Sequence, residues 1–414
     1  MKNLLYPTLL LFFLGCGFSS QKSAPPHDAS IAFYAPTPKA LPEEEYRYYN
    51  TVVKNHFEDE LINKGFNGQI LVAKNGVVVY KKTTGFADIR TKDSLAETTP
   101  LHIASISKTF TGMAILRLME QGKLMLEDTL GNFFPGFPYK GITVEMLLCH
   151  RSGLPNYLNY LSELKVKDTC YSNQDVLNSL YILKPGAEAK PGKRFSYSNT
   201  NYVLLAMILE KVTGETFPSF LKKEFFDPLQ MKHSFVYAHQ DTLTPTPSFE
   251  WTGRFWEPDP FDCTYGDKSI YTTAEDLLKW DQALSSGQLF KKETLDAAYT
   301  PLSNERRSVH NYGLGWRMMI FPNGKKFVYH NGRWHGSNAV FVRFPEENAT
   351  MIIIGNKFNR NIYNSAKKAY DLFGRYTPGN NNKEEENEDE NSINETVANF
   401  TKPADKAFYS KTRR

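Results

Sequence analysis

Segments rich in β-branched residues lie towards both ends of this chain, and the long stretch between them is poor in strand signals. The early segments, Gln69–Val72 and Val77–Tyr80, flank Lys74-Asn75-Gly76, and Asn-Gly between two such runs is typical of a β-hairpin. The late segments are Phe327–His330, Ala339–Phe344 and Thr350–Gly355. This distribution predicts one antiparallel sheet that is closed by both ends of the same domain.

The stretch between these two sets of strands is predicted to be mainly helix and loop. A helix from Ser107 to Gln121 is indicated by apolar residues at helical spacing, namely Phe110, Met113, Ala114 and Leu118. Two more helices are expected, at Asn201–Thr213 and at Thr273–Ser285, and Thr273 is positioned to cap the second. We therefore predict an α+β fold, in which an antiparallel sheet is flanked by helices and carries a mainly helical insertion.

The N-terminal residues have the pattern of an export signal. A charged start is followed by an apolar run from Leu4 to Leu14, which is too short to span a bilayer as a mature helix. The run ends in Phe13-Leu14-Gly15-Cys16, which resembles a bacterial lipobox. We predict a lipoprotein-type signal peptide at 1–15, lipidation of Cys16 and a membrane-anchored protein of the bacterial cell envelope. A plain cleaved signal or an unprocessed anchor is the alternative.

The segments on either side of the predicted folded body have the composition of extensions. Residues 16–45 are rich in Ser, Pro, Ala and Lys and are predicted to be a tether. Residues 377–414 begin with an Asn-rich stretch that leads into an acidic run, and such a run repels itself and buries little apolar surface, so a disordered tail is predicted. The folded domain is expected to occupy 46–376.

Charge and cysteine content exclude several classes of function. The formal net charge of +4 is spread over interspersed basic and acidic residues, so no nucleic-acid partner is predicted. The chain contains neither Cys-x-x-Cys nor His-Glu-x-x-His, so metal chemistry has little support. With Cys16 assigned to lipid, one disulfide at most can form, and its pairing stays open among Cys149, Cys170 and Cys263.

Ser105 and Lys108 form the first candidate catalytic pair. If Ser105 opens the predicted helix, Lys108 lies one turn further on the same face. A lysine in a partly buried cleft loses proton affinity and is then able to accept the serine proton. The same Ser-x-x-Lys spacing occurs elsewhere in the chain, where a helical surface pair is the plain interpretation. The Ser105 copy differs because it follows a hairpin and opens an apolar-faced helix.

Two further motifs carry candidate site residues. In Tyr197-Ser198-Asn199, an extended backbone would turn Tyr197 and Asn199 to the same side, where a phenol relays a proton and an amide holds a substrate carbonyl. In His330-Asn331-Gly332, predicted to end a strand, Gly332 would let a substrate backbone approach, and His330 would contact the substrate or tune the lysine and tyrosine. For Tyr197 the alternative is a loop tyrosine whose hydroxyl is bonded to backbone, and for His330 it is a structural histidine.

In this order the three motifs resemble the signature of the serine β-lactamase and penicillin-binding-protein superfamily. The Tyr-x-Asn and His-x-Gly forms are similar to its branch of class C β-lactamases, D-alanyl-D-alanine carboxypeptidases, D-aminopeptidases and esterases. The likeness extends from about Gly68 to Asn356 and includes four further segments, Ile142–Tyr157, Pro191–Tyr202, Gly266–Trp280 and Tyr312–Trp316.

The resemblance implies a role for each motif residue. Ser105 would be the nucleophile, Lys108 its base and Tyr197 a partner in proton transfer, while Asn199 would bind the substrate. The oxyanion hole would use the backbone N–H groups of Ser105 and Arg333. The resemblance implies neither a metal nor an organic cofactor. His330 stands where many relatives have lysine, and histidine carries no dependable charge at pH 7, so efficient β-lactam hydrolysis is less expected.

We therefore predict a cell-envelope serine hydrolase that acts through an acyl-enzyme on Ser105. Its substrate would be a small molecule or a peptide with an amide or ester bond, such as a peptidoglycan stem, and a D-alanyl peptidase or esterase is favoured over an efficient β-lactamase. The alternative from another class is a catalytically silent relative that binds peptidoglycan or a partner protein. The oligomeric state stays open.

Overall fold

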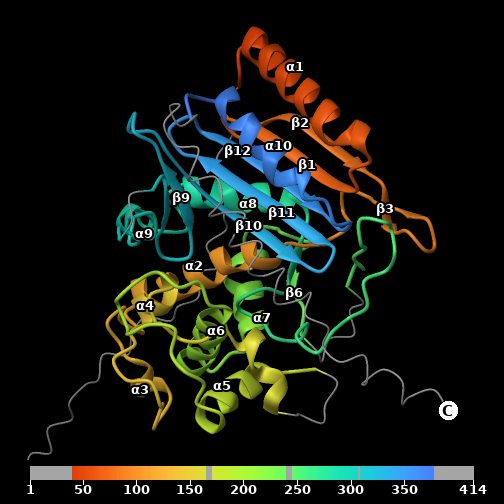
Figure 1. Ribbon diagram of the computed structural model, residues 1–414. Coiled ribbons are helices and arrows are strands. Elements are labelled where there is room, and N and C mark those ends of the chain that lie inside the picture. The colour runs from red at the N-terminus through yellow and green to blue at the C-terminus, as the bar shows by residue number, and fades with distance from the viewer. Residues whose placement is uncertain (1–39, 165–169, 239–244, 306–307, 377–414) are drawn as a thin grey trace, which may run out of the picture. The chain divides into compact units, whose positions relative to one another are not determined.

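An antiparallel sheet forms the centre of the described residues, with helices on both of its faces (Figure 1). The computed structural model describes residues 40–164, 170–238, 245–305 and 308–376. The predicted signal peptide with Cys16, nearly all of the tether and the acidic tail lie outside these residues.

Within the described residues the sheet has seven strands in the order β2-β1-β12-β11-β10-β9-β8. Smaller sheets pair β3 with β4 and place β7 between β5 and β6. The strands are β1 (Gly68–Lys74), β2 (Val77–Thr84), β3 (Phe86–Asp88), β4 (Asp93–Ser94), β5 (Leu101–His102), β6 (Phe235–Val236), β7 (Ile270–Thr272), β8 (His310–Tyr312), β9 (Arg317–Ile320), β10 (Lys326–Trp334), β11 (Ser337–Phe344) and β12 (Ala349–Gly355).

The predicted closure of the sheet by both ends of the domain is confirmed. β1 and β2 form the expected hairpin, in which Asn75 and Gly76 both have positive φ, 52° and 77°, as the tight turn between twisted strands requires. β1 also pairs with β12, so that Gly68 lies opposite Gly355. The early hairpin is thereby joined to the late strands.

The helices of the described residues include those predicted. They are α1 (Glu43–Glu60), α2 (Ser107–Glu120), α3 (Leu130–Phe133), α4 (Val144–Leu148), α5 (Asn173–Ile182), α6 (Asn199–Thr213), α7 (Phe217–Leu221), α8 (Ala274–Ser285), α9 (Lys292–Ala298) and α10 (Asn361–Ala369). The predicted cap of α8 is present, because the Thr273 side chain accepts a hydrogen bond from the backbone N–H of Asp276.

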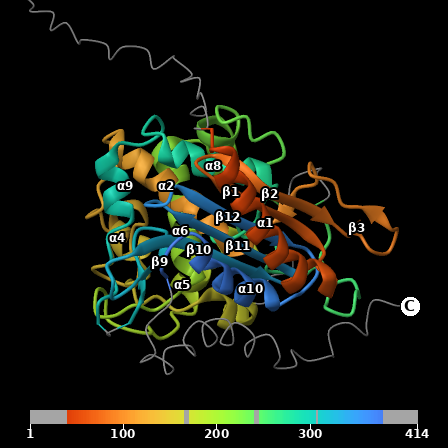
Figure 2. The same cartoon turned by 90° about the horizontal axis from the view of Figure 1, so that it is seen from above.

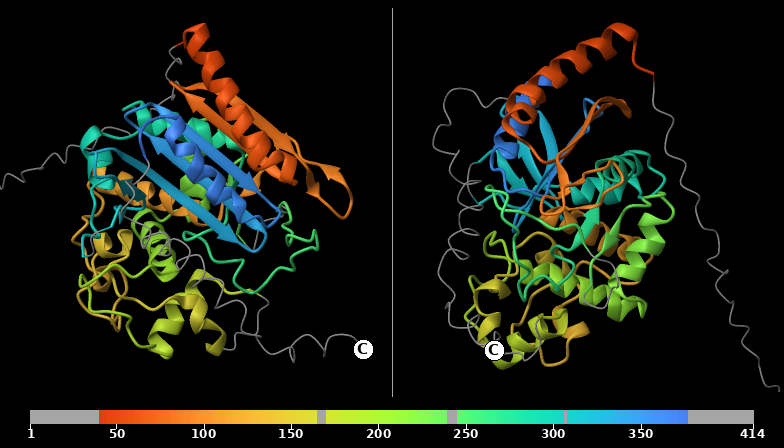
Figure 3. Two further views of the ribbon diagram at one scale, coloured as in Figure 1. Left: turned by 45° about the horizontal axis from the view of Figure 1, so that its top comes forward. Right: turned by 90° about the vertical axis from the view of Figure 1, so that its right-hand side faces the viewer.

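The alternating side chains of the strands feed two hydrophobic cores, one on each face of the sheet. On β1, Ile70 and Val72 face a core that contains residues of α1 and α10, whereas Leu71 and Ala73 face the core shared with α2 and α8. Figure 2 and Figure 3 show α1 and α10 over one face, with α8 behind the other. Because strands β1, β11 and β12 are covered on both sides, their residues are almost all buried.

The predicted helical insertion is also confirmed. α6 is the central helix of this layer and contacts α2, α4, α5 and α7. Buried residues occupy nearly every position of its first ten, as expected for a helix that is surrounded by others. The N-terminal ends of α2 and α6 carry the first two sequence motifs, Ser105 to Lys108 and Tyr197 to Asn199.

Three local expectations differ from the structure. α1 begins at Glu43, ahead of the boundary expected at residue 46. β10 continues to Trp334, so His330-Asn331-Gly332 lies inside a strand and does not end one. Tyr197-Ser198-Asn199 is only partly extended, because Asn199 is already the first residue of α6.

Among the helices of the described residues, none combines the length and the apolar character that a bilayer crossing needs.

A buried ion pair connects the sheet to α8 and yields a first prediction. Arg343 on β11 and Asp281 on α8 are 5% and 7% exposed, and Asp281 also accepts a hydrogen bond of 2.6 Å from Thr350 on β12. Replacing Asp281 by Ala leaves the Arg343 charge buried without its carboxylate. We expect the free energy of unfolding to fall by about 3–5 kcal/mol, measured by urea denaturation.

The control is the exposed ion pair within α9. Lys292 and Asp296 have side chains that are 81% and 62% exposed, so Asp296→Ala should change the free energy of unfolding by less than about 1 kcal/mol. Equal losses in the two variants would contradict the assigned importance of the buried pair.

Candidate active site

Ser105 lies in a short 3₁₀ turn, Ala104–Ile106, that leads directly into α2. Ala104 has a positive φ of 46°. Residues other than glycine rarely adopt this backbone conformation, and it often marks a functional turn. The turn leaves Ser105 half-exposed at the wall of a pocket. The N-terminal end of α2 begins two residues later, and its backbone dipole favours negative charge near the serine.

Lys108 is completely buried beside Ser105. Its Nζ lies 3.1 Å from Ser105 Oγ, 2.8 Å from Asn199 Oδ1 and 2.7 Å from the backbone carbonyl oxygen of Asp267. The three oxygens come from three separate parts of the chain. The predicted pairing of Ser105 with Lys108 therefore exists, and Asn199 lies against the lysine as well as the pocket.

Tyr197 is the second side chain in contact with Ser105 Oγ. Its hydroxyl donates a hydrogen bond of 3.1 Å to Ser105 Oγ. The ring packs on the buried His150, with ring centres 4.2 Å apart, and the Arg317 guanidinium lies 5.4 Å from its centre. The structure thus brings together Ser105, Lys108, Tyr197 and Asn199, although the bend at Asn199 and not an extended backbone does so.

His330 lines the pocket, as expected of a residue that contacts substrate or tunes the lysine and tyrosine, but its ring nitrogens contact the protein. Its ring is buried, Nδ1 lies 2.8 Å from the backbone oxygen of Asn331, and Nε2 lies 3.2 Å from the hydroxyl of Tyr312. Burial, reinforced by the nearby cations Arg317 and Lys108, holds the pKa of His330 well below its usual range. The imidazole is therefore neutral, and both of its nitrogens have partners inside the protein.

Gly332 is needed for packing within the chain. A Cβ on this residue would lie 2.1 Å from the carbonyl oxygen of Ile103, well inside van der Waals contact. The expected approach of a backbone to Gly332 therefore occurs, but the backbone is the one that leads into the Ser105 turn. This contact brings Arg333, the other predicted oxyanion donor, next to the nucleophile segment.

The pocket is lined by more cationic residues than the motifs indicated. Arg333, predicted for its backbone N–H, also lines the pocket, and its guanidinium lies 4.9 Å from the centre of the Phe358 ring. Arg317 on β9 and Lys268 line it too, and neither was predicted. The acidic residue among the lining residues is Asp267.

A buried polar network supports the loop that holds Lys108. Asp267 accepts a hydrogen bond of 2.9 Å from the Tyr157 hydroxyl, and Lys268 Nζ lies 3.3 Å from the same carboxylate oxygen. Burial lowers the pKa of Lys268 and raises that of Tyr157 well above its usual value. Tyr157 and Lys268 belong to two segments that carried the family resemblance, which was the available signal for them.

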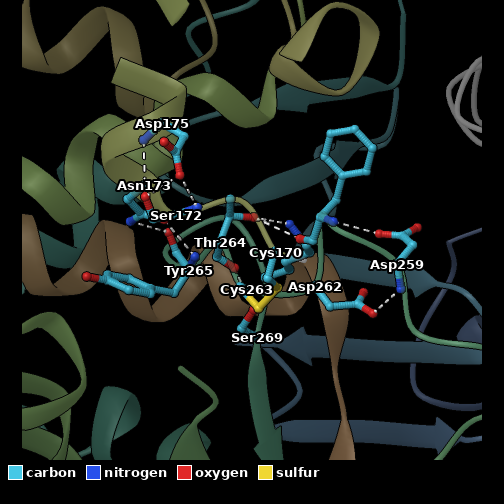
Figure 4. The surroundings of a disulfide bond; sticks show 12 residues. Cys170, Ser172, Asn173, Asp175, Asp259, Asp262, Cys263, Thr264, Tyr265 and Ser269 are labelled. Carbon is cyan, nitrogen blue, oxygen red and sulfur yellow. Dashed lines mark hydrogen bonds between the residues drawn. A yellow bond between two sulfur atoms is a disulfide. The ribbon is translucent and has the colours of Figure 1, made fainter. Parts of the chain in front are cut away.

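A disulfide between Cys170 and Cys263 ties this loop to the helical layer. Figure 4 shows the bond with Ser172 and Asn173, at the start of α5, on one side. Cys149 is buried and unpaired, and burial raises the pKa of its thiol to about 12, so it stays protonated. The pairing that the sequence left open is thus Cys170 with Cys263.

One cluster of the described residues has the composition of a metal site. Asp259, Asp262 and His335 bring ligand atoms within 4.8 Å of one another. Asp262, however, already accepts hydrogen bonds from Trp334 Nε1 at 2.6 Å, from His335 Nε2 at 2.8 Å and from the backbone of Asp259 at 2.8 Å. These bonds account for the cluster as a brace for the β10–β11 turn, and we assign no metal to it.

The fold and this arrangement of serine, lysine and tyrosine define a class, the serine hydrolases with a β-lactamase or penicillin-binding-protein fold. The family model described as Beta-lactamase matches residues 55–374, and the chain belongs to that family.

Three similar proteins illustrate the range of the family. The chain is 30% identical to "Penicillin-binding protein 4*" of Bacillus subtilis over 320 residues, 73% of this chain and 70% of the relative. It is 29% identical to "Protein flp" of Staphylococcus aureus over 69% of this chain and 59% of the relative, so the match spans less than two thirds of flp. A penicillin binding protein from Bacillus halodurans has the same fold, with a TM-score of 0.67, 23% identity and coverage of 78% of this chain and 99% of that one.

The contact between Gly332 and the nucleophile turn yields a second prediction. Gly332→Ala should displace the Ser105 turn and slow acylation of Ser105 by about 100-fold, because misplacement of a reacting atom by about 1 Å has an effect of this size. The measurement is the rate of labelling by a fluorophosphonate probe. Gly186→Ala is the control, since a Cβ there meets no atom within 4 Å. Equal labelling rates in the two variants would contradict the prediction.

Proposed function

We propose that the protein hydrolyses a peptide, amide or ester bond through an acyl-enzyme on Ser105, as a D-alanyl peptidase or esterase and not as an efficient β-lactamase. The observation that carries the proposal is the double contact at the nucleophile. Ser105 Oγ lies 3.1 Å from both Lys108 Nζ and the Tyr197 hydroxyl, and a nucleophilic serine needs a base within this reach.

The surroundings of Lys108 favour its action as the base. Asn199 Oδ1 and the Asp267 carbonyl oxygen can only accept hydrogen bonds, so each of them requires an N–H of Lys108. A neutral amine has two N–H groups, and these two acceptors use both. The remaining lone pair then points to the third partner, Ser105 Oγ, which is the position from which it removes the serine proton.

Tyr197 is placed to pass a proton on to the leaving group. Its hydroxyl touches Ser105 Oγ, and the Arg317 guanidinium lies 5.4 Å from its ring centre. Lys108 Nζ, which becomes a cation once it has taken the serine proton, lies 5.1 Å from the same centre. Both cations stabilise negative charge that develops on the phenol while the proton moves. The oxyanion of the intermediate would be held by the backbone N–H groups of Ser105 and Arg333.

The third motif supports a peptidase or esterase over an efficient β-lactamase. The buried, neutral His330 supplies no positive charge for a β-lactam carboxylate. Positive charge in the pocket comes from Arg317 and Arg333, which lie on β9 and β10. The name of the Bacillus subtilis relative attributes penicillin binding to that protein, and from it we propose that a penicillin acylates Ser105 here.

The direct test is intact-mass spectrometry after incubation with a fluorophosphonate, a penicillin and a p-nitrophenyl ester. We expect one adduct per chain on Ser105 and none with Ser105→Ala. Ser219→Ala is the matched control, because Ser219 has the same spacing to Lys222 but is exposed, and its labelling should equal that of the wild type. A folded wild-type protein that gains no adduct would favour the silent binding relative.

We also propose that the protein is a lipoprotein of the cell envelope, anchored through Cys16. The proposal rests on the short apolar run followed by Leu14-Gly15-Cys16. Cys16→Ser should move the protein from the membrane fraction to the soluble fraction, measured by fractionation and immunoblotting. Cys149→Ser is the control, since that cysteine is buried in the core. An unchanged membrane fraction for Cys16→Ser would refute the anchor.

A further inference from the structure

A second cavity adjoins the catalytic pocket. It has a volume of about 330 Å³, within the range of about 300–1,000 Å³ that is common for ligand sites. Trp334 and Lys268 line both cavities, and Lys268 Nζ lies 4.7 Å from the centre of the Trp334 ring. This pair forms the boundary between the two spaces.

The walls of the second cavity present aromatic and apolar surface. They come from the segment Pro247–Pro258, from β7 and from the end of β10, and the apolar residues among them include Pro247, Phe255, Trp256, Pro258, Tyr271 and Trp334. Tyr271 is stacked between His102 and Phe235, with ring centres 4.8 and 5.3 Å away. Its ring is therefore fixed in place before any ligand enters.

The polar groups of the walls are largely occupied within the protein. Asp88 and Arg90 pair with each other at 2.7 Å, Thr246 donates to the carbonyl of Pro100 at 2.7 Å, and Asp262 accepts from Trp334 and His335. Burial lowers the pKa of His102 to about 3, so its ring is neutral at pH 7. A sugar or an anion would find few open partners, whereas an apolar group would lose no hydrogen bonds.

The position of the cavity assigns it to one side of the scissile bond. In the proposed mechanism the leaving group takes its proton from Tyr197, whose ring contacts Arg317. Arg317 lies on β9 opposite Tyr329 of β10, the residue just before His330-Asn331-Gly332. The second cavity lies at the other end of this strand, at Trp334. A substrate held along β10 between these points would direct its acyl group to the second cavity.

We propose that this second cavity binds an apolar, aromatic part of the acyl group, so that the enzyme prefers arylalkanoyl amides and esters over short-chain ones. The inference deepens the amide- or ester-cleaving form of the proposed function, as distinct from the D-alanyl peptidase form, and rests on acylation of Ser105. It assigns specificity to Trp256, a residue outside the three motifs.

The test compares two esters with one leaving group, p-nitrophenyl acetate and p-nitrophenyl 4-phenylbutyrate. In Trp256→Ala, kcat/KM for the phenylbutyrate should fall by about tenfold, mainly through KM, as expected for losing an aromatic contact in a pocket. The kcat/KM for the acetate should change by less than about twofold, whereas the loss of a catalytic contact would lower it far more. Trp251→Ala is the matched control, because Trp251 lies in the same segment, is 71% exposed and is absent from the cavity walls.

An equal fall for both esters in Trp256→Ala, or no fall for either, would overturn the proposal. If Trp256→Ala does not fold, Trp256→Leu keeps part of the volume and takes its place. Binding of 4-phenylbutyramide to the Ser105→Ala protein, measured by calorimetry, separates this proposal from the hydrolase proposal. If the amide binds only when Trp256 is present, but the wild type turns over neither ester, the hydrolase proposal is refuted and the cavity assignment stands. If the amide binds equally well with and without Trp256, the cavity assignment is refuted.

Discussion

The side chain of Lys108 imposes the main constraint on this structure. Its nitrogen is fully buried, and a buried amine without partners would be costly. Its partners are supplied by the Ser105 turn, by the first residue of α6 and by the backbone at Asp267. The helical layer, the nucleophile turn and the loop held by the disulfide must therefore all be in place before the lysine is satisfied. The geometry of the site consequently depends on the packing of all three parts.

The fold could be predicted from the sequence because its main features are set by local interactions. Asn75-Gly76 encodes a turn whose two positive φ angles few other pairs adopt, and Thr273 encodes the start of α8 through one hydrogen bond. The exact ends of β10 were not accessible. His330-Asn331-Gly332 contains polar and small residues, which look like a strand end, but pairing with β11 through Trp334 continues the strand, and that pairing is a long-range interaction.

The candidate site could be predicted from the sequence only in part, for a related reason. Ser105 and Lys108 lie one helical turn apart, so their contact follows from local geometry. The contacts of Tyr157 with Asp267 and of Arg317 with Tyr197 join residues far apart in the chain, and no spacing rule reports them. The role expected for Gly332 was incomplete in the same way. The absence of a side chain at Gly332 allows a close backbone contact, but the backbone that makes it is that of Ile103 in the same chain.

In the functions proposed above, catalysis and selectivity would depend on different kinds of structure. The groups around Ser105 come from α2, from the start of α6 with Tyr197 just before it, and from β10, and these elements are packed against others. The second cavity is walled in part by the segment Pro247–Pro258, which has little regular structure. The hydrogen bonds of Ser105 and Lys108 described above involve no residue of that segment. Substitutions in such a segment are able to alter which acyl group is bound without displacing the nucleophile. This separation gives a physical reason why one scaffold hosts several hydrolases with different substrates.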